Sequence, residues 1–263
     1  MNQELYVGID VGASTTKAVI IDEDKKILGY SVTFSGADFE GAARKSFVEA
    51  QEQVKGVSAV SYFTVATGYG RRNVDFALDT KTEISCHGRG SFHYYPHSHT
   101  LIDIGGQDSK VIKVDSEGKR TAFKMNRKCA AGTGAFLEEM ANRLKIEIGH
   151  LNEMALKSTR EVQIGSYCTV FSATEILTKI REGVKVEDLV RGLFDSIIKR
   201  AMEMDTLDND IVMSGGVVAH NPFLVDLFQE RIRKKIFVPP LPQLIGAFGA
   251  ALYALESEGG KDA

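Results

Sequence analysis

Proline is scarce in this sequence, with 5 residues in 263, whereas glycine is abundant with 25. The scarcity of proline excludes the Pro/Gly-rich composition of disordered or fibrous chains. The charges nearly balance, and a formal net charge of -3 provides no overall positive field for a nucleic-acid backbone or an anionic membrane. Because 43% of the residues are hydrophobic, we expect a folded protein with a sizeable core and with neither nucleic acid nor membrane as its partner.

Long apolar runs and a basic leader segment are also missing. No apolar stretch approaches the ~20 residues that a membrane-spanning helix needs, and the N-terminal residues lead directly into a strand. We therefore expect a cytoplasmic protein. Cysteine occurs at Cys86, Cys129 and Cys168, which is too few for a closed disulfide framework or for a four-cysteine metal site within one chain.

The sequence contains an internal repeat. Residues 7–22 align without a gap with residues 100–115 at a constant offset of 93, so that Asp10 matches Asp103. In each copy a short apolar run ends at an aspartate, passes through glycine and small polar residues, and continues as a second apolar run. This pattern predicts a β-hairpin with a glycine-containing turn in each copy, and two related halves of one α/β fold.

Hydrophobic spacing predicts most of the remaining elements. We expect helices at residues 40–55, 187–204 and 221–235, and strands at 61–67 and 211–214. Two further helices are expected just after cysteines, one behind a glycine turn that follows Cys129 and one after Cys168. The stretch from His87 to His99 is rich in histidine, but its spacings fit no standard zinc pattern, and we interpret it as a polar connector. Cys86, just before it, is interpreted as a structural residue.

Glycine clusters follow the ends of the predicted strands. Each copy of the repeat places donor amides and a hydroxyl next to its aspartate, and successive amides in a turn can bind an anion. Two such hairpins, with a third glycine turn at Gly215 and Gly216, could hold one polyphosphate and its metal ion. The sequence has no Walker-A pattern, which excludes a P-loop enzyme.

Four segments resemble the superfamily of actin, Hsp70 and sugar kinases: GIDVGASTTK, LIDIGGQDSK, VMSGGVVAHN and GAFGAALYAL. The resemblance implies a duplicated ribonuclease-H-like α/β fold, the actin-like ATPase fold, with a nucleotide cleft between its two halves. The first half is expected over residues 1–98, closed by a C-terminal helix at 246–257. The second half is expected over residues 99–245 and contains both Cys129 and Cys168.

The same resemblance implies roles for individual residues in binding ATP or ADP with Mg²⁺. Asp10 is expected to organise the metal ion, and Asp103 to orient or activate the attacking water. Phosphate and nucleotide contacts are expected from Gly12, Ala13, Ser14, Thr15, Thr16, Lys17, Gly105, Gly106, Gln107, Gly215, Gly216 and Gln243. Lys17 lies where it could contact phosphate, although its counterpart Lys110 could equally mark the surface end of a hairpin.

Cys129 and Cys168 each precede a predicted helix, in CAAGTGAFLEEMANRL and CTVFSATEILTKI. Backbone amides and the helix dipole favour negative charge at a helix N-terminus, which suits thiolates that bind an anionic iron–sulfur cluster. A [4Fe–4S] cluster usually takes four thiolates, and two cysteines from each chain of a symmetric dimer would supply them.

The segments NRKCAAGTGAFLE, SYCTVFSATE, ATGYGR, EISCHG and DIGGQDSK resemble the ATP-dependent activators of 2-hydroxyacyl-CoA dehydratases and the related ATPase subunits of benzoyl-CoA reductases. The resemblance implies a homodimer that binds ATP in each subunit and shares one [4Fe–4S] cluster, with Cys129 and Cys168 as its ligands. It further implies ATP-driven one-electron transfer, under anaerobic conditions, to a dehydratase or a related iron–sulfur protein, double-cubane proteins included. A ferredoxin or a flavodoxin-like protein is the implied electron donor.

Two other functions remain open from the residues alone. A small-molecule kinase would use the same nucleotide cleft, but no residues indicate a substrate-specificity region. A regulatory ATPase without a cluster would bind a protein partner and leave Cys129 and Cys168 as ordinary thiols. Burial of these two cysteines in the core is a further possibility, since free cysteine behaves as a small hydrophobic residue.

Overall fold

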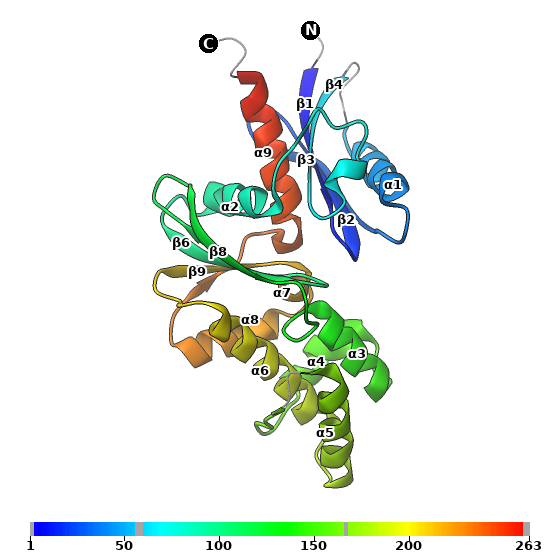
Figure 1. Cartoon of the computed structure of the whole chain (residues 1–263), viewed down its shortest axis with the longest axis vertical. Helices are drawn as coiled ribbons and strands as arrows, with labels where there is room; N and C mark the ends of the chain where they lie inside the picture. The colour runs from blue at the N-terminus through cyan, green and yellow to red at the C-terminus, as the bar shows by residue number, and fades with distance from the viewer. Residues whose placement is uncertain (1–2, 56–59, 166–167, 260–263) are drawn as a thin grey trace. The chain divides into compact units, whose positions relative to one another are not determined.

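The computed structural model describes residues 3–55, 60–165 and 168–259, which form two five-stranded sheets with helices packed around them (Figure 1). The first two residues of the SYCTVFSATE segment, Ser166 and Tyr167, lie outside the described residues. The strands are β1 Gln3–Val11, β2 Thr15–Ile21, β3 Ile27–Phe34, β4 Val60–Thr67, β5 Asp79–Thr80, β6 His99–Ile104, β7 Ser109–Val114, β8 Arg120–Asn126, β9 Asp210–Ser214 and β10 Ile236–Phe237.

The helices alternate with these strands along the chain. The α-helices are α1 Phe39–Gln51, α2 Glu83–Tyr94, α3 Gly134–Leu144, α4 Leu151–Leu156, α5 Thr169–Arg181, α6 Val186–Met204, α7 Gly216–His220, α8 Pro222–Ile232 and α9 Ile245–Gly259. Short 3₁₀ helices are η1 Arg71–Asn73, η2 Ile148–His150 and η3 Pro242–Leu244. Among the described residues, none of these helices has both the length and the apolar character that crossing a membrane requires.

The two sheets repeat one strand order. The first sheet has the order β3-β2-β1-β4-β5 and the second has the order β10-β9-β6-β7-β8, so that β1 corresponds to β6 and β2 to β7 when the second is read in reverse. β1 pairs with β2 in antiparallel and with β4 in parallel orientation, and β6 pairs with β9 in parallel orientation. Each copy of the sequence repeat therefore forms two neighbouring strands at the same place in its sheet, as the repeat predicts.

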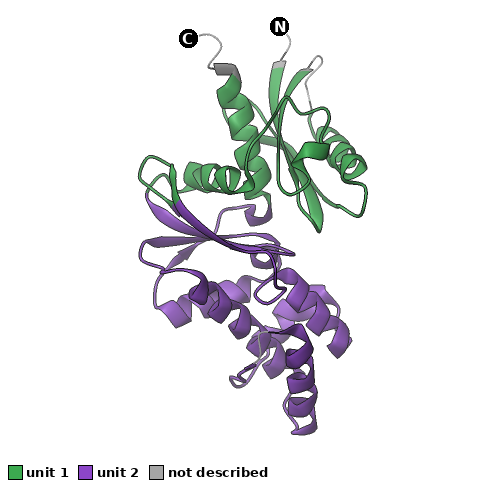
Figure 2. Cartoon of the chain, in the orientation of Figure 1, with its two compact units in different colours: residues 1–97, 114–121, 244–263 green, residues 98–113, 122–243 purple. Residues whose placement is uncertain are grey.

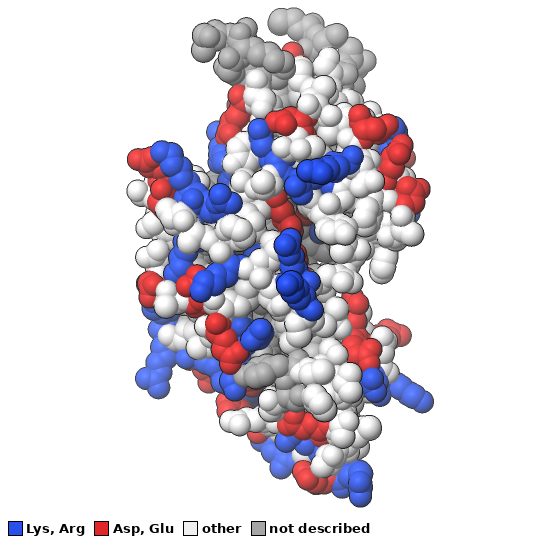
Figure 3. Space-filling model, viewed as in Figure 1, with Lys and Arg blue, Asp and Glu red and all other residues white. Residues whose placement is uncertain are grey.

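The chain divides into two compact units (Figure 2). Unit 1 comprises residues 1–97, 114–121 and 244–263, and unit 2 comprises residues 98–113 and 122–243. The expected halves at 1–98 and 99–245 stay a prediction. Acidic and basic side chains are interspersed over the face of the molecule that Figure 3 shows.

The central strand of unit 1 is buried along almost its whole length. Leu5, Val7 and Ile9 of β1 have no exposed surface, and α1 and α9 both pack against this sheet. Such a continuous apolar run is typical of a strand that is covered on both faces. Gly8 allows α9 to approach closely, because a Cβ atom at Gly8 would lie 1.8 Å from the carbonyl oxygen of Ala247. α9 therefore packs closely against β1 near the end of the strand, where Asp10 lies.

Unit 2 has its own hydrophobic core between its sheet and its helices. Ile102 of β6 and Met213 of β9 pack there with Phe136 of α3 and with Phe194 and Ile197 of α6. These side chains are 0–1% exposed. Packing in this core fixes the position of α3 relative to β6. The start of α3 therefore has a fixed position relative to the loop after β6.

The helix after Cys129 begins at Gly134, behind the expected glycine turn, in which Gly132 adopts a φ of +79°. One prediction about local structure is wrong. The histidine-rich stretch is not a polar connector, since α2 covers its first part and both His87 and His99 are buried. The buried face of α2 consists largely of glycine and small residues packed against α9, which hydrophobic spacing does not detect.

Candidate phosphate-binding and cysteine sites

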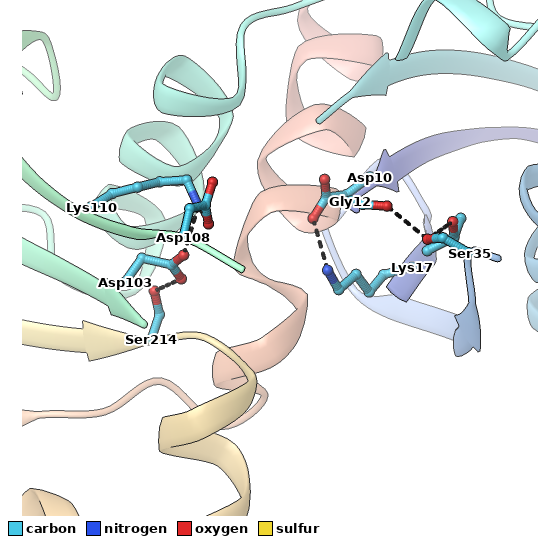
Figure 4. Close-up of polar contacts among 9 residues, drawn as sticks. Asp10, Gly12, Lys17, Ser35, Asp103, Asp108, Lys110 and Ser214 are labelled. Carbon is cyan, nitrogen blue, oxygen red and sulfur yellow. Dashed lines mark hydrogen bonds and ion pairs between the residues drawn. The ribbon is translucent and has the colours of Figure 1, made fainter. Parts of the chain in front are cut away.

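The first hairpin places an aspartate and a lysine opposite each other. Asp10 and Lys17 are cross-strand partners in the β1–β2 register, and Lys17 Nζ lies 3.5 Å from Asp10 Oδ2 (Figure 4). The turn between the strands is closed by a hydrogen bond of 3.1 Å from the Gly12 N–H to the Thr15 carbonyl. Asp10 is 3% exposed, so the strand end carries a buried carboxylate beside a short glycine-containing loop.

The second hairpin repeats this arrangement with more contacts. Lys110 Nζ lies 3.2 Å from Asp103 Oδ2 and 2.7 Å from Asp108 Oδ1 (Figure 4). The Ser214 hydroxyl at the end of β9 donates to Asp103 Oδ1 at 2.7 Å. The suggestion that Lys110 marks a surface end is wrong, because its side chain is 2% exposed and lies between two carboxylates.

The turn of the second hairpin is joined to the start of α3. The Gly105 N–H donates to the Asp108 carbonyl at 2.9 Å, which matches the turn of the first hairpin. The carbonyls of Gly105 and Gly106 accept from the backbone N–H groups of Gly134 and Ala135, at 2.9 and 2.7 Å. The first amides of α3 are thus used to hold this loop, and the loop and the helix start form one hydrogen-bonded piece.

The third glycine turn lies between β9 and α7 in the same unit. Gly215 has a φ of +103°, and its N–H donates to the Pro242 carbonyl at 3.0 Å. A Cβ atom at Gly215 would lie 2.2 Å from the Ile104 carbonyl oxygen, and one at Gly216 would lie 3.3 Å from Nε2 of Gln243. The structure thus brings Gly215, Gly216 and Gln243 together near the end of β6, whereas Gln107 is exposed at its turn.

The surroundings of Asp10 fit a hydrated Mg²⁺ ion. Its Oδ1 atom is buried and has no hydrogen-bond partner within the described part of the chain. Gly68 and Gly246 approach the carboxylate closely, and a Cβ atom at either would crowd it, at 2.5 Å from Oδ1 and 3.1 Å from Oδ2. Carboxylate oxygen is the ligand type that Mg²⁺ prefers, usually together with several waters. The orphaned Oδ1 oxygen is therefore a suitable donor for the ion or one of its waters.

The two cysteines that precede helices are both exposed free thiols of unit 2. Cys168 is the N-cap residue of α5, as predicted, whereas Cys129 lies in the turn before α3. The Asn126 side-chain amide donates to the carbonyls of Cys129 at 3.1 Å and Ala131 at 2.9 Å, and so fixes that turn. Before Cys168, the Gly165 N–H donates to both oxygens of Glu175 at 2.9 and 3.0 Å.

This donor set fits one half of an iron–sulfur site. Thiolate sulfur is the usual ligand of a [4Fe–4S] cluster, and four are needed. Within the described ranges, no group of three or more His, Cys, Asp or Glu side chains could hold a metal ion. Cys86 is fully buried in α2, and burial raises the pKa of its thiol to about 12. Cys129 and Cys168 are therefore the thiols that remain accessible to a metal, and burial of either in the core is excluded.

Some residues of these sites were not predicted from the sequence. They are Ser35, Asp108, Asn126 and Ser214, each of which hydrogen-bonds to a predicted residue or to its loop. Three of them had a detectable signal, because Asp108 lies inside the repeat, Ser214 directly precedes Gly215, and Asn126 is the first residue of the NRKCAAGTGAFLE segment. Ser35 lies in none of the quoted motifs.

Comparison with known proteins places these features in context. The model of the BadF/BadG/BcrA/BcrD ATPase family matches residues 7–254. The (R)-2-hydroxyglutaryl-CoA dehydratase activating ATPase of Acidaminococcus fermentans is 40% identical over 252 residues, which cover 94% of this chain and 96% of the relative. The solved structure of the activator of the 2-hydroxyisocaproyl-CoA dehydratase from Clostridium difficile with bound ADPNP has a TM-score of 0.89 and 36% identity, and covers 98% of both chains.

A more distant likeness concerns the fold alone. The structure of a ROK family glucokinase from Streptomyces griseus, in complex with glucose and AMPPNP, has a TM-score of 0.58 at 14% identity. It covers 96% of this chain and 99% of the glucokinase chain. Together with the repeated sheet order, these similarities confirm the duplicated actin-like ATPase fold that the sequence resemblance implies.

Proposed function

The chain belongs to the BadF/BadG/BcrA/BcrD ATPase family, and on this premise we propose that it is an ATP-dependent activator of a 2-hydroxyacyl-CoA dehydratase. Similar proteins with 40% and 36% identity over nearly the whole chain carry this role in their names. The proposal in full is that ATP hydrolysis drives one-electron transfer from this chain to the dehydratase or to a related iron–sulfur protein, double-cubane proteins included. A ferredoxin or a flavodoxin-like protein would supply the electron.

The two hairpins would bind Mg²⁺-ATP. We assign Asp10 to the metal ion or its waters, because its buried Oδ1 has no partner among the described residues. We assign Asp103 to the attacking water, since Ser214 and Lys110 hold its carboxylate in one orientation. The backbone amides of both loops would contact the phosphates. Phosphoryl transfer depends mainly on positioning and electrostatic stabilisation, which such loops and carboxylates provide.

The redox part of the proposal rests on one observation. Cys129 and Cys168 are exposed free thiols near the starts of two helices of the same unit, while Cys86 is buried. A [4Fe–4S] cluster held by these thiolates and by the same two residues of a second copy would supply reversible one-electron chemistry. The amides and the dipole at the start of α5, where Cys168 is the N-cap residue, would help to balance its negative charge.

A continuous set of hydrogen bonds could couple ATP to the cysteines. The carbonyls of Gly105 and Gly106 are bound to the first amides of α3, and the Ser109 hydroxyl donates to the carbonyl of Gly132. Cys129 lies in the turn that leads into this helix start. A movement of the phosphate loop on ATP binding would therefore be passed to the Cys129 turn. Changes in hydrogen bonding and solvent exposure around the sulfurs shift the potential of an iron–sulfur centre.

Iron and acid-labile sulfide per chain, measured on protein purified without oxygen, test the redox part. We expect about two irons and two sulfides per chain, which corresponds to one [4Fe–4S] cluster per dimer. Cys129→Ser and Cys168→Ser should each lose the iron and the brown colour. Cys86→Ala is the matched control and should keep both, since that thiol is fully buried.

A second measurement separates ATP hydrolysis from the cluster. Asp103→Asn should abolish ATP hydrolysis and dehydratase activation while leaving the iron content unchanged, because Asp103 does not contact either exposed cysteine loop in the described hydrogen bonds. A colourless, iron-free protein prepared anaerobically would contradict the redox function. It would leave a regulatory ATPase or a small-molecule kinase as the function to test.

A further inference from the structure

Ser35, a residue outside the repeat, makes two hydrogen bonds to the loop of the first hairpin. Ser35 directly follows β3 and is 2% exposed. Its hydroxyl donates to the Gly12 carbonyl at 2.7 Å (Figure 4). Its backbone N–H donates to the Ser14 carbonyl at 3.1 Å. A single buried serine thus uses both of its donors on carbonyls of this loop.

The Ser35 hydroxyl is itself fixed by a buried neighbour. Its oxygen lies 2.9 Å from Oγ1 of Thr16, which has no exposed surface. Because a serine hydroxyl has one hydrogen and Ser35 donates it to the Gly12 carbonyl, Thr16 must be the donor in this contact. Thr16 therefore donates to the Ser35 hydroxyl, and Ser35 donates to the Gly12 carbonyl.

The carbonyls of Gly12 and Ser14 are consequently occupied by donors from Ser35. The Val11 carbonyl also has a donor, because it accepts from the Gly70 N–H at 2.9 Å. By contrast, the N–H groups of Ala13 and Ser14 have no acceptor among the residues that the structure describes. A loop with these carbonyls bound and these amides available is an anion-binding arrangement, whereas carbonyls facing a phosphate would repel it.

The second hairpin supports this interpretation independently. Its carbonyls at Gly105 and Gly106 are also bound, in that case by the first amides of α3. In both copies of the repeat, donors therefore occupy the loop carbonyls, but the donors differ between the copies. In the first copy the donor to the Gly12 carbonyl is the Ser35 hydroxyl instead of a helix amide.

We propose that Ser35 is a positioning residue for the first phosphate-binding loop. It holds the carbonyls of Gly12 and Ser14 away from the nucleotide, so that the amides of Ala13 and Ser14 face the phosphates. This role rests on the proposed binding of ATP. It concerns the phosphates alone and has no part in holding the adenosine.

Nucleotide affinities of Ser35→Ala test the proposal in the holoprotein. We expect this variant to bind ADP and ADPNP, each with Mg²⁺, about 10-fold more weakly, which equals about 1.4 kcal/mol and matches the loss of one buried hydrogen bond. Its affinity for adenosine should not change. A merely structural defect would weaken all three ligands alike, and calorimetric titration measures each of them.

Ser31→Ala is the matched control. Ser31 lies on β3, is 7% exposed, and donates its hydroxyl to the Ser46 carbonyl at 2.6 Å rather than to the loop. It should bind all three ligands as the unsubstituted chain does, and its unfolding midpoint gives the stability cost of losing a buried serine hydroxyl. Ser35→Thr keeps the hydroxyl and should restore the ADP affinity to within about 2-fold.

Several outcomes would overturn the role of Ser35. Wild-type ADP affinity in Ser35→Ala would do so, as would an equal loss in Ser31→Ala or in Ser35→Thr. If Ser35→Ala does not fold, Ser35→Cys takes its place, because cysteine has a similar shape but donates only weakly, and wild-type ADP affinity in that variant would also overturn the role. If the unsubstituted chain binds neither ADP nor ADPNP, the ATP-dependent function and the role of Ser35 both fail. Failure of Ser35→Ala alone to show the loss leaves the function intact.

Discussion

At the residue scale, the same aspartate–lysine pair has different surroundings in the two hairpins. Lys17 makes one contact of 3.5 Å to Asp10, and its side chain is 14% exposed. Lys110 contacts both Asp103 and Asp108, and its side chain is 2% exposed. Lys17 can therefore reach a phosphate after losing a single weak contact, whereas two carboxylates hold Lys110 in place. We therefore assign phosphate contact to Lys17 and a structural role to Lys110.

Lys110→Met should destabilise the protein strongly. Removing one partner of a buried ion pair leaves an uncompensated charge, and the expected loss in the free energy of unfolding is about 3 kcal/mol. Urea unfolding monitored by circular dichroism measures this loss. Lys17→Met, the equivalent change in the first hairpin, is the internal control: it should cost less stability and weaken ADP binding instead. Equal stability losses in the two variants would contradict the assignment.

The sequence was sufficient to place the residues that repeat. Asp10 and Asp103 were predicted at strand ends because they recur at one offset within apolar runs, and the structure puts each at the penultimate position of its strand. Ser35 could not be predicted, because serine is common and its contact with Gly12 spans 23 residues. The burial of Lys110 was missed because lysine is almost never buried unless it is paired, and pairing depends on the tertiary fold.

At the element scale, side chains of α5 and α6 both hold the chain before Cys168. Asp188 in the first turn of α6 accepts from the backbone N–H groups of Thr159 at 2.7 Å and Arg160 at 3.1 Å. The Thr159 N–H is the main cause that holds the pKa of the Asp188 carboxyl below its ordinary value, and the Arg160 N–H adds to it. The charge of one helix start therefore stabilises the turn that leads towards the second exposed cysteine.

The lowered pKa of Asp188 gives a prediction for acid stability. Because its folded-state pKa lies below the ordinary 3.8, the ionised carboxylate stabilises the fold above that value, and this contribution is lost as pH falls through the folded-state pKa. Asp188→Asn should thus unfold at a lower temperature than the wild type at pH 7. The difference should shrink as the pH falls below about 4. Thermal unfolding of both proteins across this range measures it.

Glu187→Gln is the control for the helix dipole. Glu187 lies in the same first turn of α6, so its substitution removes the same charge near the helix N-terminus. Among the described residues it accepts none of the bonds that Asp188 accepts from Thr159 and Arg160. If Glu187→Gln lowers the unfolding temperature as much as Asp188→Asn does, the backbone bonds are not the cause.

The limits of sequence patterns are also visible in the helices. Hydrophobic spacing predicted α6 and α8 because each buries an apolar stripe. It missed α2 because the face towards α9 uses glycine: a Cβ atom at Gly90 would lie 2.4 Å from the Ile245 carbonyl oxygen.

At the scale of the whole molecule, the count of accessible thiols determines the assembly that we propose. Cys129 and Cys168 supply two ligands, and within the described parts of the chain no larger ligand group exists. Two exposed apolar side chains, Val170 and Phe171, lie two and three residues after Cys168, at 63% and 67% exposure. A second copy that completes the cluster would also cover these side chains. The cysteine count in the sequence already suggested a cluster shared by two chains. The burial of Cys86 supports this proposal, because it leaves Cys129 and Cys168 as the accessible thiols of the chain.

Removal of the cluster should therefore convert the dimer into a monomer. Anaerobic protein is expected to have twice the 28.8 kDa mass of the chain, and chelation of its iron after mild oxidation should halve that mass. ADP binding should persist in the monomer, because the Asp10 and Asp103 hairpins do not use the cysteines. Native mass spectrometry and calorimetry measure the two effects, with Cys86→Ala as a control that should behave as the wild type. A stable iron-free dimer at the same concentration would show that the subunits associate through another surface, and would leave the cluster without its bridging role.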